Sequence, residues 1–183
     1  MTVPAEHHDA FVAALAAAEP LGVDVTFVVG GPSRQASVAA GLAVLPAEVD
    51  IVLVHDAARA LAPASLTAEV VRAVRDGHRA VIPGLPVVDS VVEVTHGRAL
   101  PVDRARLRLV QTPQGFDRVL LDRAHAAAAD RAGDERSAAT DDASLCAALG
   151  EPVHVVAGHH AAAKITTARD LVLAELLLQG ETR

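Results

Sequence analysis

The sequence has no tryptophan, no tyrosine and only three phenylalanines. Its hydrophobic content is nevertheless 51%, which argues against a disordered chain and predicts a core built from Ala, Val and Leu. The only cysteine, Cys146, excludes an internal disulfide and suits the reducing cytoplasm. We expect Cys146 to pack as a small apolar side chain in a helix.

Excess basic charge and long hydrophobic runs are also missing. The net charge of −7 offers no basic surface for nucleic acid, and apolar runs such as residues 51–54 are far too short to cross a membrane. The N-terminus has neither the basic nor the apolar region of a signal peptide, so we expect none. The histidine pairs at 7–8 and 159–160 lack the spacing of a metal site. These features predict a cytoplasmic protein without nucleic-acid or membrane partners.

The order of apolar segments indicates the fold class. A chain of 183 residues suits a single domain, 1–183, and no linker or repeat divides it. Strand-like runs alternate with segments of helical spacing, which is typical of an open, mostly parallel α/β sheet with helices on both faces. Thr167 and Asp170 form a capping-box pattern at the start of the last helix. We expect strands at 25–29, 51–54, 80–82 and 153–156, and helices at 9–18, 33–45, 63–77, 118–132, 141–149 and 167–178.

One stretch breaks this alternation. From Val87 to Phe116, apolar and polar residues alternate around a His96-Gly97 pair, which is typical of a hairpin turn. We therefore expect an antiparallel insertion in the sheet, a β-arm at about 87–109.

The motif HDAAR, residues 55–59, directly follows the apolar run 51–54. Since ligands of open α/β sheets bind beyond the carboxyl ends of the strands, we expect His55, Asp56 and Arg59 at the functional edge. A carboxylate there can hold Mg²⁺ or a sugar hydroxyl, and the fork of Arg59 suits phosphate. The alternative is that Asp56 and Arg59 only pair with each other or cap the next helix.

A second motif, GGPSRQAS at residues 30–37, follows another strand-like run. Two glycines let the backbone approach a ligand closely, and Ser37 lies in the first turns of the helix that follows. A plain tight turn with Ser33 as the helix N-cap is the commoner outcome for such a pattern.

Three further segments hold candidate residues. TDDAS at 140–144 is explained by helix capping, with Thr140 as the N-cap. Pro113 forces Thr112 to be extended, which is typical of a rigid loop. Lys164 is the only lysine among sixteen basic residues, and it would be a point cation for phosphate if it reaches the same edge. Chance survival of one surface lysine is the alternative.

Taken in order, the segments GGPSRQASV, VHDAAR, VQTPQGF, TDDASL and KITT resemble the 2-C-methyl-D-erythritol 4-phosphate cytidylyltransferase family, from about Thr2 to Leu178. The resemblance implies a Rossmann-like nucleotidyltransferase fold. It also implies transfer of a cytidylyl group from CTP to 2-C-methyl-D-erythritol 4-phosphate with Mg²⁺, releasing pyrophosphate in non-mevalonate isoprenoid biosynthesis, by a homodimer joined through the β-arm. A similar enzyme that acts on ribitol 5-phosphate and a non-catalytic dimeric remnant are the alternatives.

The same resemblance assigns roles to individual residues. It implies a catalytic group, within which Asp56 would also be the Mg²⁺ ligand: Lys164, Asp56 and Arg59. It implies a nucleotide site formed by Gly30, Gly31, Pro32, Ser37, Asp56 and Ala57. In this site, backbone atoms of Gly31 and Pro32 would recognise the base. It implies an acceptor site formed by Arg59, Thr112 and Thr140. Ser90 and Arg104 from the other subunit of the dimer would complete this site.

The family's first strand and its glycine-rich loop with Arg and Lys, which hold the CTP triphosphate, have no counterpart upstream of Gly30. Without that strand its neighbours would have unpaired backbone groups, and the triphosphate would lose a cation. We therefore expect the 183 residues alone to have little or no cytidylyltransferase activity. A start site assigned too far downstream and a truncated gene or protein are the two explanations considered.

Overall fold

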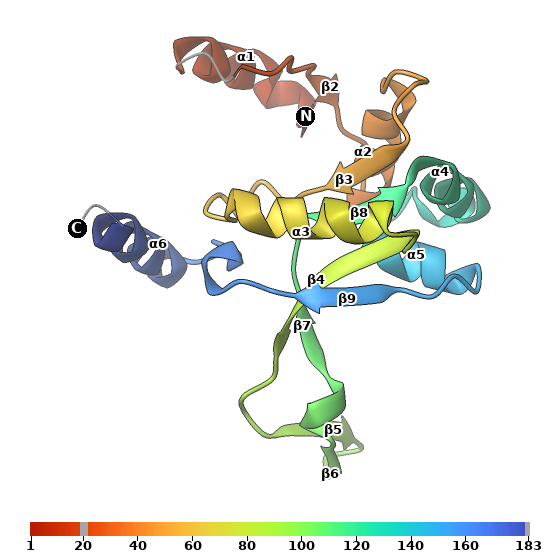
Figure 1. Cartoon of the computed structure of the whole chain (residues 1–183), viewed down its shortest axis with the longest axis vertical. Helices are drawn as coiled ribbons and strands as arrows, with labels where there is room; N and C mark the ends of the chain where they lie inside the picture. The colour runs from red at the N-terminus through yellow and green to blue at the C-terminus, as the bar shows by residue number, and fades with distance from the viewer. Residues whose placement is uncertain (19–21, 182–183) are drawn as a thin grey trace. The chain divides into compact units, whose positions relative to one another are not determined.

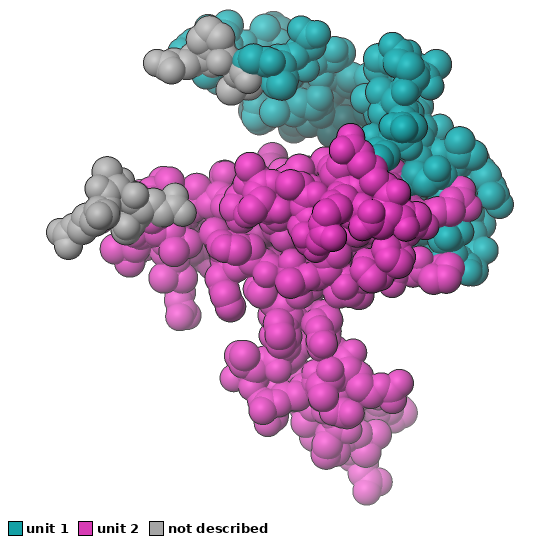
Figure 2. Space-filling view, viewed as in Figure 1, with its two compact units in different colours: residues 1–52, 117–151 teal, residues 53–116, 152–183 magenta. Residues whose placement is uncertain are grey.

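The computed structural model describes residues 1–18 and 22–181. The sequence predicts one domain, and the contacts of the chain form two compact units (Figure 2). Unit 1 comprises residues 1–52 and 117–151, and unit 2 comprises residues 53–116 and 152–183. The boundaries fall inside two strands, β3 (Ile51–Val54) and β8 (Gln114–Asp117). Within the described ranges, no helix is both long and apolar enough to span a membrane.

Among the described residues, unit 1 contains four α-helices and the parallel pair β1–β2, in which Thr2 lies opposite Val28. Ser33 caps α2 as the sequence predicts, because its Oγ accepts a hydrogen bond from the amide of Ala36 at 3.0 Å. Cys146 is fully buried in α5, which confirms the expectation for the lone cysteine. The elements of this unit are β1 (Thr2–Val3), η1 (Ala5–His7), α1 (His8–Ala17), β2 (Val28–Val29), α2 (Arg34–Ala43), α4 (Arg118–Ala127), η3 (Ala129–Arg131) and α5 (Asp142–Ala148).

The main sheet has five strands in the order β3-β8-β4-β7, with β9 (His154–Ala157) also paired to β4 (Ala80–Pro86) (Figure 1). β4 pairs in parallel with β9 and antiparallel with β8 and with β7 (Arg108–Val110). The predicted α/β class is therefore confirmed, and the sheet is mixed in direction. The expected strand at 80–82 continues to Pro86, because the chain enters the arm from the end of β4.

Helix α3 (Ala64–Arg75) packs on this sheet. It begins after Pro63, and Gly77 beyond its end has a φ of +103°, so the predicted start and stop signals act as expected. The helix buries an apolar stripe against the sheet, including Val70 and Val74. The contact is close, because a Cβ added at Gly115 of β8 would lie 2.5 Å from a methyl carbon of Val70.

The predicted β-arm is confirmed. Strands β5 (Val91–Thr95) and β6 (Arg98–Val102) pair antiparallel, and the hairpin extends away from the sheet of its own unit (Figure 1). His96 and Gly97 form the turn with φ values of +49° and +75°, as a two-residue hairpin turn of the primed type requires. A single 3₁₀ turn, η2 (Arg104–Arg106), leads the chain back to the sheet.

Helix α6 (Ala168–Glu181) begins with the capping box that the sequence predicts. The amide of Asp170 donates to Thr167 Oγ1 at 3.2 Å, and the amide of Thr167 donates to Asp170 Oδ2 at 2.8 Å. The amide and hydroxyl of Thr166 donate to the same carboxylate oxygen. These hydrogen bonds, led by that from the Thr166 amide, lower the pKa of Asp170 to about 2.

Two expected elements are shorter than the sequence suggests. The strand expected at 25–29 is limited to β2, and the helix expected at 118–132 ends at Ala127. After Ala127 the chain continues in the 3₁₀ turn η3, where the carbonyl oxygen of Ala128 accepts from the amide of Arg131 at 3.1 Å and from the side-chain amide of Gln35 at 2.9 Å.

Candidate functional site

The loop after β3 presents the HDAAR motif in a tight turn. The amide of Arg59 donates to the carbonyl oxygen of Asp56 at 2.9 Å, which closes the turn. A second backbone hydrogen bond, from Ile165 to the carbonyl of Ala58 at 2.8 Å, joins this turn to the segment that carries Lys164. Main-chain contacts within unit 2 thus bring together two motifs that lie more than a hundred residues apart.

Two cations flank the Asp56 carboxylate. Arg59 Nε lies 3.5 Å and Lys164 Nζ lies 3.3 Å from Asp56 Oδ2. The side chains of Asp56 and Arg59 are mostly buried, whereas that of Lys164 is 48% exposed. The structure therefore brings together the three residues expected to be catalytic, and it leaves the ammonium group open to an anion from solvent.

The guanidinium of Arg59 is anchored on the main chain. It donates to the carbonyl oxygens of Ala162 at 2.8 Å and of Val110 at 3.3 Å. The alternative expected from the sequence, a pairing of Asp56 with Arg59, is thus also present. Because a planar fork held at two edges cannot swing freely, Arg59 contributes a fixed positive charge to the turn.

Thr112 supports the same turn from a neighbouring loop. Its Oγ1 accepts a hydrogen bond from the amide of Asp56 at 3.0 Å and lies 3.0 Å from His55 Nδ1. The residue is buried, and the preceding Gln111 exchanges two hydrogen bonds with the backbone of His159. The predicted rigid loop is therefore present, and its threonine hydroxyl fixes the HDAAR turn.

In unit 1, the GGPSR motif forms a turn beside a cleft. The amide of Gly31 donates to Ser37 Oγ at 3.1 Å, and a Cβ added at Gly31 would lie 2.4 Å from the Cβ of Ala36. Gly31 and Pro32 are exposed, and together with Gly30 and Ser37 they line a cleft of about 440 Å³. The close approach of the turn to the helix explains the glycine, and the cleft leaves backbone atoms accessible to a ligand.

Thr140 is exposed at the start of the TDDAS motif and does not cap α5. The expectation that it is the N-cap is wrong, because Asp141 takes that position and its Oδ1 accepts from the amide of Ser144 at 2.7 Å. Asp142 lies in the first turn of α5, where a carboxylate suits the helix N-terminus, and its side chain is also buried between Arg34 and His125. No local pattern indicates this cluster, because its members come from three separate segments.

The arm carries the two remaining candidates. Ser90 and Arg104 are exposed, and an Arg104 guanidinium nitrogen contacts the carbonyl oxygen of Val88. Several large apolar side chains of the arm are also exposed, including Val94 at 66% and Leu100 at 56%. Single exposed apolar residues are ordinary, but a cluster of them on a projecting hairpin is typical of a surface that contacts another chain.

The described residues contain no group of three or more His, Cys, Asp or Glu side chains that could hold a metal ion. Mg²⁺ needs less from a protein, since it is commonly held by one or two carboxylates together with substrate phosphates. The mostly buried carboxylate of Asp56 is chemically suited to that kind of shared site.

Comparison with known proteins identifies the family. Residues 2–180 match the family described as IspD, 2-C-methyl-D-erythritol 4-phosphate cytidylyltransferase. The chain belongs to this family. It is 50% identical over 167 residues to the enzyme of that name from Streptomyces avermitilis and 51% identical over 178 residues to that from Nocardia farcinica.

A solved structure of a family member agrees with the fold. The 2-C-methyl-D-erythritol 4-phosphate cytidylyltransferase from Thermus thermophilus is 45% identical and superposes with a TM-score of 0.75, covering 89% of this chain and 77% of that one. The chain covers 64% of the Streptomyces relative and 72% of the Nocardia relative, while those alignments span 87% and 96% of this chain. The predicted family and fold class are thus confirmed, whereas the individual site residues stay predictions.

Proposed function

We propose that this IspD-family chain transfers a cytidylyl group from CTP to 2-C-methyl-D-erythritol 4-phosphate, giving 4-diphosphocytidyl-2-C-methyl-D-erythritol and pyrophosphate. The observation that carries the proposal is the cluster of Asp56, Arg59 and Lys164, in which both cations lie within 3.5 Å of one carboxylate oxygen. A reaction between two polyanions requires such fixed positive charge before its phosphates can approach each other.

The chemistry needs little from the protein beyond alignment and charge. A phosphate oxygen of the acceptor attacks the α-phosphorus of CTP in line, and the bond from that phosphorus to the leaving pyrophosphate breaks. The acceptor phosphate is already largely ionised near neutral pH, so no general base is required. Lys164, with its half-exposed ammonium, would contact the reacting phosphates, and the anchored Arg59 would face the acceptor phosphate.

Asp56 would hold Mg²⁺ together with phosphate oxygens of the nucleotide, and the ion would supply charge neutralisation when bound. Within the protein, Thr112 and His55 hold the Asp56 turn in place, as the two 3.0 Å contacts of the threonine hydroxyl indicate. This arrangement supports the proposal that Asp56 presents its carboxylate in one orientation.

The nucleotide base and ribose would occupy the cleft beside Gly30, Gly31, Pro32 and Ser37. The exposure of the Gly31-Pro32 backbone supports this assignment. The ribose contact that the resemblance implies for Ala57 stays a prediction. Proline has no amide hydrogen, so residue 32 can offer the base only its carbonyl oxygen.

The acceptor would contact Thr112, and a homodimer formed through the arm would add Ser90 and Arg104 to the site of the other subunit. The exposure of both arm residues and of apolar side chains around them supports this proposal. The acceptor contact that the resemblance implies for Thr140 stays a prediction. A cytoplasmic location, consistent with the single cysteine, is part of the same proposal.

The test combines turnover with binding. Purified protein is incubated with CTP, Mg²⁺ and either methylerythritol phosphate or ribitol 5-phosphate, pyrophosphate release is followed, and CTP binding is measured by calorimetry. We expect CTP binding and a preference for methylerythritol phosphate as the acceptor. Absence of CTP binding would contradict the proposal and favour a non-catalytic protein, and a preference for ribitol 5-phosphate would change the assigned acceptor.

A further inference from the structure

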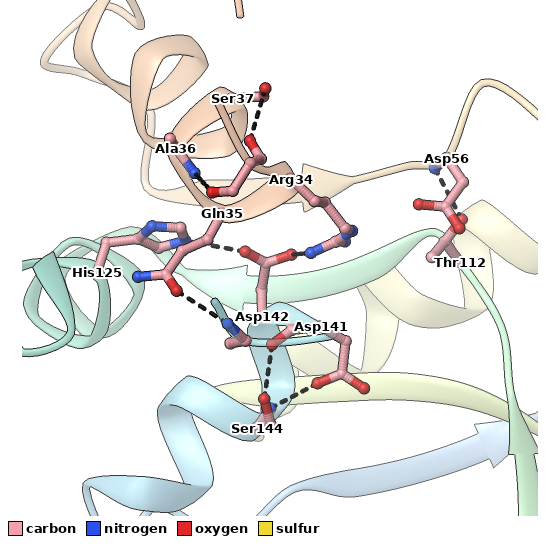
Figure 3. A network of polar contacts seen from close by, with 12 residues as sticks. Arg34, Gln35, Ala36, Ser37, Asp56, Thr112, His125, Asp141, Asp142 and Ser144 are labelled. Carbon is pink, nitrogen blue, oxygen red and sulfur yellow. Dashed lines mark hydrogen bonds and ion pairs between the residues drawn. The ribbon is translucent and has the colours of Figure 1, made fainter. Parts of the chain in front are cut away.

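A buried charge cluster lies directly behind the turn proposed to read the nucleotide base. The side chain of Asp142 is 1% exposed, and its two oxygens lie 2.8 Å from Arg34 Nη1 and 2.9 Å from His125 Nε2. Figure 3 shows Asp142 between these two side chains. The carboxylate of Asp142 therefore forms an ion pair with Arg34 and a hydrogen bond with His125 Nε2.

This cluster fixes the start of α2 more firmly than helix capping alone. A buried carboxylate is costly unless it is paired, so Asp142 holds Arg34 in place, and Arg34 is the first residue of α2. Only Ser33 separates Arg34 from Pro32 along the chain. Displacement of Arg34 would therefore move the backbone that lines the cleft.

Neighbouring contacts anchor the same short segment to the same part of unit 1. The Gln35 side chain donates to the carbonyl of Ala128 at 2.9 Å and accepts from the amide of Ala139 at 3.0 Å. The hydroxyl of Ser33 donates to the carbonyl of Ala132 at 2.7 Å. These hydrogen bonds join the start of α2 to residues 128–139, and the Arg34–Asp142 ion pair adds a charged contact at the same place.

We propose that Arg34 and Asp142 are positioning residues that hold the Gly31-Pro32 backbone in the geometry that distinguishes cytosine from uracil. The inference rests on the proposed function, because it assumes that a cytidine nucleotide occupies this cleft. Neither side chain is assigned a contact with the base, and the pair acts through the turn.

The chemistry of the two bases explains why geometry decides selectivity at this turn. Cytosine presents an amino donor where uracil presents a carbonyl acceptor. A backbone carbonyl aimed at that position attracts cytosine and repels uracil, and Pro32 can contribute nothing else from its main chain. The Gly31 amide is already bonded to Ser37 Oγ at 3.1 Å, so the position of the carbonyl oxygens in this turn determines which base is preferred. A turn that loosens would then lose discrimination before it loses all affinity.

The experiment compares CTP and UTP, each with Mg²⁺ and without acceptor, by calorimetry. The proteins are the unchanged chain, Arg34→Met, Asp142→Asn and Arg34→Lys. We expect the unchanged chain to favour CTP, and the ratio of the two dissociation constants to fall roughly tenfold in Arg34→Met and in Asp142→Asn. Arg34→Lys keeps the charge and should restore part of the ratio.

The control is Leu121→Ala, which opens a cavity at a fully buried position on α4 of the same unit without changing a polar contact of the turn. It should lower the melting temperature and leave the CTP-to-UTP ratio unchanged. An unchanged ratio in a folded Arg34→Met or Asp142→Asn protein would overturn the inference, and so would an equal loss in Leu121→Ala. If the unchanged chain binds neither nucleotide, the proposed function fails and the inference fails with it. If it binds both equally, only the inference fails.

Discussion

The ammonium group of Lys164 lies 3.3 Å from a carboxylate oxygen of Asp56, although more than a hundred residues separate the two along the chain. The single lysine of the sequence therefore lies beside the carboxylate that follows β3. A compact, half-exposed ammonium beside a fixed carboxylate suits contact with a substrate phosphate.

Lys164→Met should reduce acceptor-dependent pyrophosphate release by roughly 10²-fold, because it removes a cation aimed at the charge that develops in the transition state. Stability should change by less than about 1 kcal/mol, since a half-exposed ion pair contributes little. Arg169→Met, at an exposed position five residues further on, is the matched control and should leave activity unchanged. Equal activity in Lys164→Met and the unchanged chain would remove Lys164 from the site.

Gly31→Ala should weaken CTP binding, because the added Cβ would lie 2.4 Å from the Cβ of Ala36 and force the turn away from α2. Overpacking of this kind typically costs about 1–3 kcal/mol. Gly133→Ala provides a control in the same unit, where an added Cβ meets no described heavy atom within 4 Å. Calorimetry with CTP measures the effect, and equal affinity in both variants would show that the turn does not need its glycine.

The carboxyl group of Asp170 should titrate at a pKa of about 2, below its ordinary value of 3.8, because hydrogen bonds from Thr166 and Thr167 favour its charged form. A lowered pKa means that this contribution to stability is present above the ordinary value and is lost as the pH falls through about 2. A carbon-detected NMR titration of the Asp170 carboxyl measures the value directly. In Thr167→Val, which lacks one of the donors, the pKa should move upward, and an unchanged pKa would contradict the assigned cause.

Val94→Glu should weaken a homodimer formed through the arm, because Val94 is 66% exposed on β5 and a charge there would need to be buried in the interface. Sedimentation velocity over a range of protein concentrations measures the change. Val119→Glu introduces the same charge at a 63% exposed position on α4 and should leave assembly unaffected. A monomeric unchanged chain, or equal assembly in both variants, would refute the proposed role of the arm.

Local signals in the sequence predicted most element boundaries. The apolar run 51–54 is a strand, Ser33 caps a helix and the His96-Gly97 pair makes the hairpin turn, because each feature is decided by a few adjacent residues. The motifs also predicted the cluster around Asp56, since the ends of strands and the loops that follow them meet at one edge of a sheet.

Errors arose where distant residues decide the structure. The helix that begins at Arg118 ends at Ala127 and gives way to the 3₁₀ turn η3. The Ala128 carbonyl there also accepts from Gln35, a distant residue that no local pattern near Ala128 indicates. Thr140 and Asp141 are both good capping residues, so sequence preference could not choose between neighbouring positions. Only the fold reveals that Asp142, in the first turn of α5, also pairs with Arg34 and His125.

The start of α6, which the hydrogen bonds of Asp170 hold, bears on whether activity or secondary structure is lost first when the protein is heated. Lys164 is separated from that helix by only a few residues. The backbone bond from Ile165 to Ala58 and the hydrogen bond from Arg59 to Ala162 join the lysine segment to the HDAAR turn. A terminal helix with leucines such as Leu176 more than half exposed frays more readily than a sheet. Activity should therefore be lost at a lower temperature than the circular dichroism signal. At that temperature the chain is still folded, but the Lys164 ammonium group has left the Asp56 carboxylate.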